Sequence, residues 1–158
     1  MKIENLMTRE VQTCHAADPL TIPAQKMWES DIGSLPVVDD DQHVIGMITD
    51  RDICMAAYTQ GRSLSEIPVS VAMSKELFAC TPSDSIKDAE EVLRSHQIRR
   101  LPVLNEYRKP VGIVSLSDII REAEHETSLK NREISTQEVT ETLATISQPR
   151  QHNGRTTA

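Results

Sequence analysis

The octapeptide Gly46-Met47-Ile48-Thr49-Asp50-Arg51-Asp52-Ile53 returns 66 residues later as Gly112-Ile113-Val114-Ser115-Leu116-Ser117-Asp118-Ile119. Ahead of it, Leu35-Pro36-Val37 returns at the same offset as Leu101-Pro102-Val103, and the match runs without a gap from Met7–Ile53 onto Met73–Ile119. An internal repeat of this length predicts two copies of one structural unit. We expect the two units to pack face to face, with two related clefts between them.

The composition excludes several classes of protein. A chain of 158 residues is about one domain long and buries roughly two-thirds of its unfolded surface. Its 17 basic and 24 acidic residues give a net charge of −7, which argues against a partner such as duplex nucleic acid that needs a basic face. We therefore expect any anionic ligand to be held by a local cluster of cations.

The sequence also predicts a cytoplasmic protein that is not attached to a membrane. No apolar run approaches the length of about 18 residues that spans a bilayer. The first five residues, Met1-Lys2-Ile3-Glu4-Asn5, lack the apolar stretch of a secretory signal.

The three cysteines, Cys14, Cys54 and Cys80, are odd in number and lack CxxC spacing, so they do not form a disulfide framework. Cys14 and Cys80 occupy equivalent positions of the repeat. One interpretation makes them small buried side chains in matched strands. The other makes them a redox pair or a metal site across the pseudo-twofold axis.

Each unit is predicted to have the order β-α-β-β-α. A short extended segment precedes a helix, two short runs rich in Val and Ile then form a hairpin, and a second helix opens at Thr49 or Ser115. The fold class is α/β, or more narrowly α+β, with two pseudo-twofold-related units packed through their sheets. The expected strand segments are 11–14, 35–38 and 44–48 in the first unit, and 77–80, 101–104 and 111–114 in the second.

The predicted boundaries follow the repeat. Residues 1–60 form the first unit, 61–68 a connector that contains Gly61 and Pro68, and 69–125 the second unit. Within the units, Asp18 and Asp84 are predicted to cap the first helix of each.

Residues 126–158 are a polar tail that is expected to be partly helical and then disordered. Ser135 with Glu138 resembles a capping box, and Val139, Leu143 and Ile146 form an apolar stripe. This segment is interpreted either as a short helix docking on a partner subunit or as a loosely ordered, solvated helix followed by a disordered tail from Gln148.

The strand-to-helix corner Gly46-x-x-Thr49-x-x-Asp52 and its copy Gly112-x-x-Ser115-x-x-Asp118 are the sharpest candidates for a site. A helix amino terminus offers unpaired N–H groups that suit a phosphate, and a nearby carboxylate suits the hydroxyls of a ribose. The same pattern is also an ordinary helix cap. Duplication copies caps as faithfully as ligand sites, so the repeat does not decide between the two.

A second signal breaks the symmetry of the repeat. The second unit has Arg99-Arg100 where the first has Gly33-Ser34. A guanidinium is well shaped to grip phosphate oxygens. The alternative is that the two arginines are solvated or paired with acids such as Glu90-Glu91, and Arg51, beside Asp52, is a further basic candidate with the same alternative.

Known enzyme motifs are missing from the sequence. It contains no Walker loop, GxGxxG, HExxH or Gly-x-Ser-x-Gly elbow, and its five histidines show no ligand spacing. We expect a protein that is not an enzyme and that has no metal site and no obligatory cofactor. A small hydrolase is disfavoured because no positioned base and nucleophile can be named.

These residues resemble a known family, the tandem pair of cystathionine β-synthase (CBS) domains called a Bateman module. The resemblance covers about Ile3 to Glu124. It is carried by the Met7-Thr8 and Met73-Ser74 openings, the doubled Leu-Pro-Val strands and the doubled Gly-h-h-[Thr/Ser]-x-x-Asp-h corners, where h is an apolar residue.

The resemblance implies that the clefts bind an adenine nucleotide (AMP, ADP or ATP) and, in some members, S-adenosylmethionine. In one cleft Asp118 would hold the ribose hydroxyls, Ser115 the ribose or phosphate, and Arg99 and Arg100 the phosphates, with adenine against Ile32 and Leu35 of the other unit. The second cleft would use Thr49, Asp52 and Arg51, with Ile98 and Leu101 opposite. Because Gly33-Ser34 replaces the arginine pair there, that cleft is expected to be weaker or empty.

The resemblance further implies a flat, disc-like homodimer and an unidentified protein partner on another chain. The leading hypothesis is thus a sensor of an adenosine-containing small molecule. The alternative is a structural dimerisation or protein-interaction module without a ligand, in which the corners are only helix caps.

Overall fold

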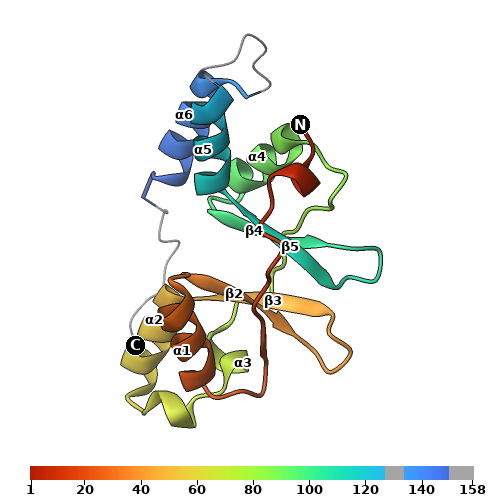
Figure 1. The fold of residues 1–158 in the computed structure, drawn as a ribbon. Coiled ribbons are helices and arrows are strands. Elements are labelled where there is room, and N and C mark those ends of the chain that lie inside the picture. The colour runs from red at the N-terminus through yellow and green to blue at the C-terminus, as the bar shows by residue number, and fades with distance from the viewer. Residues whose placement is uncertain (127–133, 150–158) are drawn as a thin grey trace.

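The computed structural model describes residues 1–126 and 134–149. Two small sheets face each other at the centre of the molecule, and helices cover the outer face of each sheet (Figure 1). A small cluster of Val38, Val44 and Leu104 packs where the two sheets meet. The predicted fold class, two related α+β units packed through their sheets, is confirmed.

The first unit contains β1 (Cys14–His15), α1 (Thr21–Ser30), β2 (Ser34–Val38), β3 (Val44–Thr49) and α2 (Asp50–Gln60), followed by the short α3 (Val69–Ala72). The second contains α4 (Ile86–Ser95), β4 (Arg100–Leu104), β5 (Pro110–Ser115), α5 (Leu116–Glu126) and α6 (Thr136–Ile146). Single 3-10 turns lie at Ile3–Asn5 and Leu64–Glu66.

The repeat holds strand by strand. Strands β2 and β3 form an antiparallel hairpin in which Ser34 pairs with Thr49, and β4 and β5 form another in which Arg100 pairs with Ser115. The first extended segment is shorter than predicted: β1 spans two residues, and its counterpart is a single parallel bridge between Cys80 and Val103.

The predicted caps at Asp18 and Asp84 are wrong. Each carboxylate instead closes the turn before the helix, since Asp18 Oδ2 accepts from the His15 N–H at 2.8 Å and Asp84 Oδ2 accepts from the Thr81 N–H at 2.7 Å. Ser85 caps α4, and α1 begins without a side-chain cap. The aspartates find N–H groups in the turn on their amino-terminal side, which leaves the helix start to the residues that follow.

The opening segment of each repeat lies in the sheet of the other. Thr8 and Ile113 exchange two backbone hydrogen bonds of 2.9 Å, which add the amino-terminal arm to β5. Ser74 and Met47 do the same on β3, at 2.8 and 3.2 Å. Ile3 is correspondingly buried in the core of the second unit. The boundaries 1–60, 61–68 and 69–125 remain a proposal for how the chain divides along the sequence. The packing does not follow this division, because a segment of each unit pairs with the sheet of the other.

Gly46 and Gly112 make these crossings possible. A Cβ on Gly46 would lie 2.2 Å from the Ser74 carbonyl oxygen, and one on Gly112 would lie 2.4 Å from Met7 Sδ. Neither glycine has a positive φ. The glycine of each corner is therefore needed for the close approach of the crossing segment.

Helix α6 docks on its own chain, against α4 and α5 (Figure 1). Val139 and Ile146 are buried in the core of the second unit together with Ile134. The Ser135 hydroxyl accepts from the Glu138 N–H at 3.4 Å, as predicted for a cap. The structure thus corrects both interpretations of the helix, since neither placed it in this core. Beyond Pro149 the predicted disordered tail lies outside the described residues.

The cysteine prediction that favoured burial is confirmed. Cys14 and Cys80 are free thiols with only 1% and 5% of their surface exposed. Burial raises the pKa of each thiol to about 12, with smaller contributions from Asp18 and Asp84. Both side chains serve as small core residues in matched positions beside β2 and β4.

Candidate functional site

The corner at the start of α5 is a complete cap. The Ser115 N–H and hydroxyl both donate to Asp118 Oδ2, at 2.8 and 2.6 Å, and the Asp118 N–H donates to Ser115 Oγ at 3.2 Å. The other carboxylate oxygen, Oδ1, pairs with Arg121 one turn further along the helix. Ser115 and Asp118 are both half-buried.

The corner at the start of α2 repeats this geometry. The Thr49 N–H and hydroxyl donate to Asp52 Oδ2, at 2.9 and 2.7 Å, and the Asp52 N–H donates to Thr49 Oγ1 at 3.1 Å. The capping interpretation of the sequence is therefore realised in both units. Each cap uses one carboxylate oxygen, Oδ2.

The two arginines flank the start of α5. Arg100 is the ladder partner of Ser115, and the Arg99 carbonyl accepts from the Leu116 N–H at 2.9 Å. Both side chains are exposed. The acids that could have paired with them are engaged elsewhere, because Glu91 pairs with Arg94 and Glu90 is buried.

Arg100 also reaches the corner of the first unit. A Cβ on Gly33 would lie 3.4 Å from Arg100 Nη1 and 3.3 Å from Asp50 Oδ2, so the guanidinium and the carboxylate approach the same point from different units. Gly33 is fixed there because its carbonyl accepts from the Asp50 N–H at 3.2 Å. The lack of arginine in Gly33-Ser34 thus does not leave the first corner without a nearby cation.

Asp50 is the residue of this cluster that sequence reasoning missed. Leu116 occupies the equivalent position of the second unit, so the repeat gave no reason to single it out. Its neighbour Arg51 is exposed, and the Arg51 N–H donates to Asp50 Oδ1 at 2.7 Å. The available signal was the charge of Asp50 at a helix start, where an acidic side chain is favoured.

The predicted apolar contacts divide into two kinds. Ile32 and Ile98 are half-buried and lie just before β2 and β4. Leu35 and Leu101 are fully buried in the cores of their own units. Contact of these four residues with an adenine ring stays a prediction.

Two further findings concern only residues 1–126 and 134–149. Within them, no group of three or more His, Cys, Asp or Glu side chains is arranged to hold a metal ion. Within the same ranges, no helix has the length and apolarity required to cross a membrane. A pocket of about 300 Å³ lies away from both corners, between α5 and α6.

Two α+β repeats packed sheet to sheet, each with a capped helix start beside the interface, define a tandem domain pair. The CBS domain family matches the chain twice, at residues 3–58 and 64–125. The chain belongs to the CBS domain family.

Similar proteins agree with this assignment. The CBS domain-containing protein YhcV of Bacillus subtilis is 39% identical over 118 residues, which cover 74% of this chain and 81% of that protein. Hypoxic response protein 1 of Mycobacterium tuberculosis is 35% identical over 117 residues, with the same coverage.

Solved structures show the same fold. A crystal structure of Hypoxic Response Protein I with two coordinated zinc ions has a TM-score of 0.70 and 33% identity, and covers 77% of this chain and 98% of that one. The CBS domain pair of protein MJ0100, in complex with 5'-methylthioadenosine and S-adenosyl-L-methionine, has a TM-score of 0.73 and 21% identity, with coverage of 80% and 98%. At that identity the second comparison concerns the fold alone.

Proposed function

We propose that this chain is a cytoplasmic, non-enzymatic regulatory module that binds an adenine nucleotide between its repeats. AMP, ADP and ATP are the primary candidates, and S-adenosylmethionine is a further one. The module self-associates and passes the state of the site to a protein partner on another chain. The observation that carries the proposal is the exposed Arg99-Arg100 pair, whose backbone adjoins the start of α5: Arg100 is the ladder partner of Ser115, and the Arg99 carbonyl accepts from the Leu116 N–H.

The chemistry of this corner suits a nucleotide. The start of α5 offers the positive end of a helix dipole, and two guanidinium groups add the local cations that an acidic chain needs to hold phosphate. Asp118 is the acceptor for the ribose hydroxyls, and Ser115 lies beside it. The MJ0100 pair shares this fold and its two ligands both contain adenosine, so this class of ligand is the first to test here.

The corner of the first unit is proposed as the weaker of the two nucleotide sites. Thr49, Asp52 and Arg51 would contact a second nucleotide there, with Ile98 and Leu101 opposite. Asp50 Oδ2 and Arg100 Nη1 both lie near Gly33, so the negative charge of Asp50 opposes the attraction of phosphate to this corner. We therefore assign the principal site to the Ser115–Asp118 corner, with Ile32 and Leu35 on the adenine side.

Isothermal titration of the purified chain with AMP, ADP, ATP and S-adenosylmethionine tests the proposal. Asp118→Asn and Arg99→Ala/Arg100→Ala should each weaken binding by about 10-fold or more, since a hydrogen bond to a charged group contributes about 1.5–3 kcal/mol. Asp88→Asn is the matched control, because Ser85 and Asp88 form the same capping box at the start of α4, away from the arginine pair. It should leave binding unchanged.

A second function, an interaction module without a ligand, is favoured by the complete caps in both corners. It predicts that Asp118→Asn, Asp52→Asn and Asp88→Asn each cost about 1 kcal/mol of stability and that no nucleotide raises the melting temperature. Absence of heat with all four compounds, or equal loss of binding in the Asp88→Asn control, would sink the ligand assignment.

A further inference from the structure

A guanidinium contacts the proposed ribose acceptor of the second unit. Arg121 Nη2 donates to Asp118 Oδ1, the carboxylate oxygen that the cap of α5 does not use. The side chain of Asp118 is 12% exposed, whereas that of Arg121 is 74% exposed. The guanidinium therefore lies at the surface of the corner, where it can exchange the carboxylate for water.

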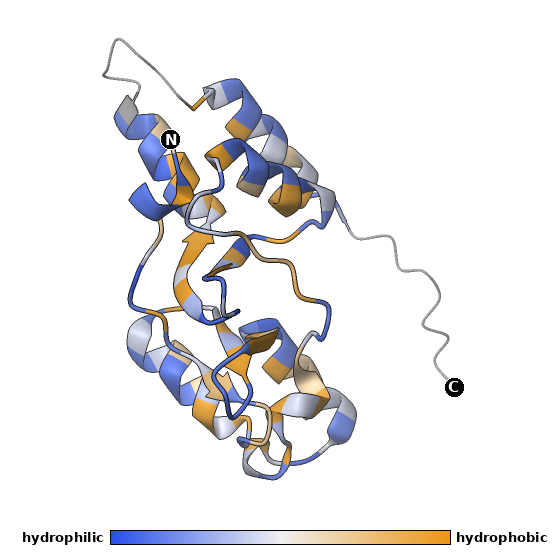
Figure 2. Cartoon of the chain, turned by 90° about the vertical axis from the view of Figure 1, so that its right-hand side faces the viewer, coloured by the Kyte–Doolittle hydropathy of each residue, from blue (hydrophilic) through white to orange (hydrophobic). Residues whose placement is uncertain are grey.

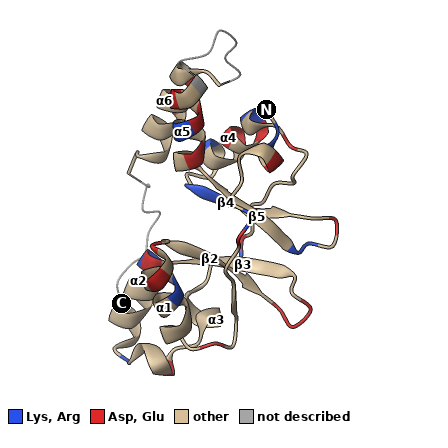
Figure 3. Cartoon of the chain, in the orientation of Figure 1, with Lys and Arg blue, Asp and Glu red and all other residues tan. Residues whose placement is uncertain are grey.

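The corner of the first unit has no such pair. At the offset of 66, Met55 occupies the place of Arg121 and Asp52 that of Asp118. Within the part of the chain that the structure describes, no group donates to Asp52 Oδ1. Figure 3 shows charged segments along α5 but only at the beginning of α2. The two aspartates thus have the same cap and differ in what their second oxygen contacts.

A count of acceptor positions shows what this difference means for a ribose. An ionised carboxylate has about four lone-pair positions, two on each oxygen. At each corner the cap fills both positions of Oδ2. Asp52 keeps both positions of Oδ1, whereas Asp118 keeps one because Arg121 fills the other. The two hydroxyls of a ribose donate two hydrogen bonds, so Asp118 cannot accept both while Arg121 is in place.

The hydroxyls of the two caps do not change this comparison. Ser115 Oγ donates to Asp118 Oδ2 and accepts from the Asp118 N–H, and Thr49 Oγ1 makes the same two contacts with Asp52. Each hydroxyl therefore has the same capacity left for a ligand. The difference between the corners lies in Arg121 alone among the groups that contact the two carboxylates.

We propose that Arg121 is a specificity-determining residue of the second corner, because it must leave Asp118 Oδ1 before a ribose can donate both hydroxyls there. The inference rests on the proposed nucleotide site and adds a residue to it. Binding exchanges the Arg121–Asp118 pair for a second hydrogen bond from the ribose, so Arg121 lowers the affinity for ribonucleotides. It has no such effect on nucleotides without the 2′ and 3′ hydroxyls. The second corner therefore discriminates less strongly than the first between the two kinds of nucleotide.

Isothermal titration with AMP and ATP, each beside its 2′,3′-dideoxy form, tests this role. An Asp52→Asn background weakens the first corner, so that the titration reports on the second. Arg121→Met introduces the side chain that the first unit carries at the same position. It should raise the ratio of ribonucleotide affinity to dideoxynucleotide affinity by about two- to five-fold, the size expected for release of an exposed ion pair.

The reverse substitution tests the first corner. Met55→Arg, in an Asp118→Asn background, places a guanidinium three residues after Asp52, as in the second unit. It should lower the same ratio by a similar factor. Circular dichroism of each variant establishes that it is folded, and Met55→Arg decides the question if Arg121→Met does not fold.

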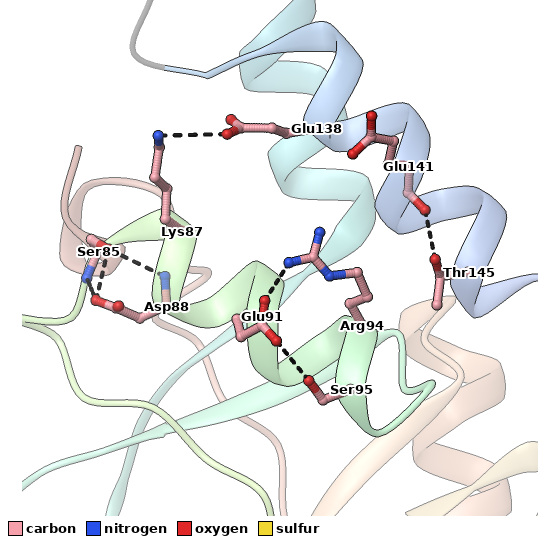
Figure 4. Close-up of polar contacts among 9 residues, drawn as sticks. All are labelled: Ser85, Lys87, Asp88, Glu91, Arg94, Ser95, Glu138, Glu141 and Thr145. Carbon is pink, nitrogen blue, oxygen red and sulfur yellow. Dashed lines mark hydrogen bonds and ion pairs between the residues drawn. The ribbon is translucent and has the colours of Figure 1, made fainter.

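Arg94→Met is the matched control. Arg94 pairs with Glu91 three residues before it on α4, so the substitution breaks the same kind of pair and removes the same charge outside both corners (Figure 4). The lost charge acts on the phosphates of both nucleotide forms, which carry the same number of them. The ratio of the two affinities should therefore stay the same.

An unchanged or lower ratio in Arg121→Met, with the ribonucleotide still bound, would overturn the role of Arg121 and leave the nucleotide site standing. An equal rise of the ratio in Arg94→Met would overturn it as well. Absence of binding by both ribonucleotides, in the wild type and in Arg121→Met, would refute the proposed nucleotide site and this role of Arg121 with it.

Discussion

Gly46 and Gly112 show how a single residue type serves the architecture of this pair. In the sequence each glycine opens a corner that resembles a ligand site, and glycine is a common device for bringing backbone close to a ligand. In the structure the space beside each glycine is filled by the chain itself, by Ser74 in one unit and by Met7 in the other. The lack of a side chain at Gly46 and Gly112 therefore permits the close packing that joins the two repeats.

Gly46→Ala should destabilise the protein by about 1–3 kcal/mol, because its Cβ would overlap a backbone carbonyl that cannot move without breaking the Ser74–Met47 pairing. Urea unfolding measures the loss. Gly33→Ala is the control, since a Cβ there meets only the ends of the Asp50 and Arg100 side chains. An equal or larger loss in Gly33→Ala would contradict this account of the crossing.

Arg100 shows which features of a single residue could be predicted from the sequence and which could not. Its place near Ser115 could be predicted, because a hairpin formed by the runs 101–104 and 111–114 brings their outer ends, and with them Arg100 and Ser115, together. The direction of its side chain could not, because that depends on how the two units approach each other. The repeat gives the pattern of a single unit and does not describe contacts between the two units. Asp50, the neighbouring group in the first unit, aligns with the uncharged Leu116 of the second.

The helices and strands could be predicted from local sequence patterns, but the docking of helix α6 could not. The spacing of Ile86, Ala89, Val92 and Leu93 predicted the buried face of α4, on which Val92 is only partly buried. The short Val- and Ile-rich runs predicted both hairpins. Helix α6 was recognisable from its cap and stripe. Its place on α4 and α5 could not be predicted, because the receiving surface is assembled from distant parts of the chain. Figure 2 shows hydrophobic residues, in orange, alternating with hydrophilic ones along several helices, so an apolar stripe alone does not identify where a helix docks.

The contact between α4 and α6 contains a buried acid. Glu90 is 5% exposed, and its Oε1 has no hydrogen-bond partner among the residues that the structure describes. The Thr142 hydroxyl on α6 is likewise buried without a partner among them. Burial raises the pKa of Glu90, the charge of Glu138 adds to the effect, and Arg94 and Lys87 oppose it. An ionised Glu90 therefore weakens the packing of α6 at neutral pH.

The stability of this contact should depend on pH. Because the folded pKa of Glu90 lies above its ordinary value of 4.5, the stabilising contribution of the neutral form is present below that value and is lost as the pH rises through the folded pKa. Glu90→Gln should therefore be more stable than the wild type at pH 7, by about 1 kcal/mol. Urea unfolding and hydrogen exchange of the α6 amides, at pH 4.5 and 7, measure the difference.

Glu91→Gln is the matched control for Glu90→Gln. Its hydrogen bonds from Arg94 and Ser95 lower the pKa of Glu91, so the stability that it contributes is present at pH 7 and is lost as the pH falls. The two substitutions should therefore act in opposite directions at pH 7. A Glu90→Gln protein less stable than the wild type at pH 7 would show that the carboxylate is paired in solution.

At the scale of the whole molecule, each repeat depends on a segment contributed from outside its own boundaries. Ile3 is fully buried in the core of the second unit, while Val69 is fully buried in that of the first. The opening segments have the same local sequence pattern in both repeats. An alignment of the repeats therefore cannot show which sheet each segment joins.

Ile3→Ala should destabilise the second unit, although residue 3 belongs to the first unit in the sequence. A large-to-small substitution at a fully buried position costs about 2–5 kcal/mol. Hydrogen exchange should show faster opening of β5 and α4, with a smaller effect on β3 and α2. Val71→Ala, at a 54% exposed position, is the control and should change little. Loss of protection confined to the first unit would refute the exchange of segments.

The exchanged arm also sets an order of events during synthesis on the ribosome. Thr8 is made 105 residues before its partner Ile113. At translation rates of about 5–20 residues per second, the arm stays unpaired for roughly 5–20 s. The first repeat likewise completes its sheet only once Ser74 has emerged. The nascent chain thus carries an open strand edge until nearly all of the pair has been translated.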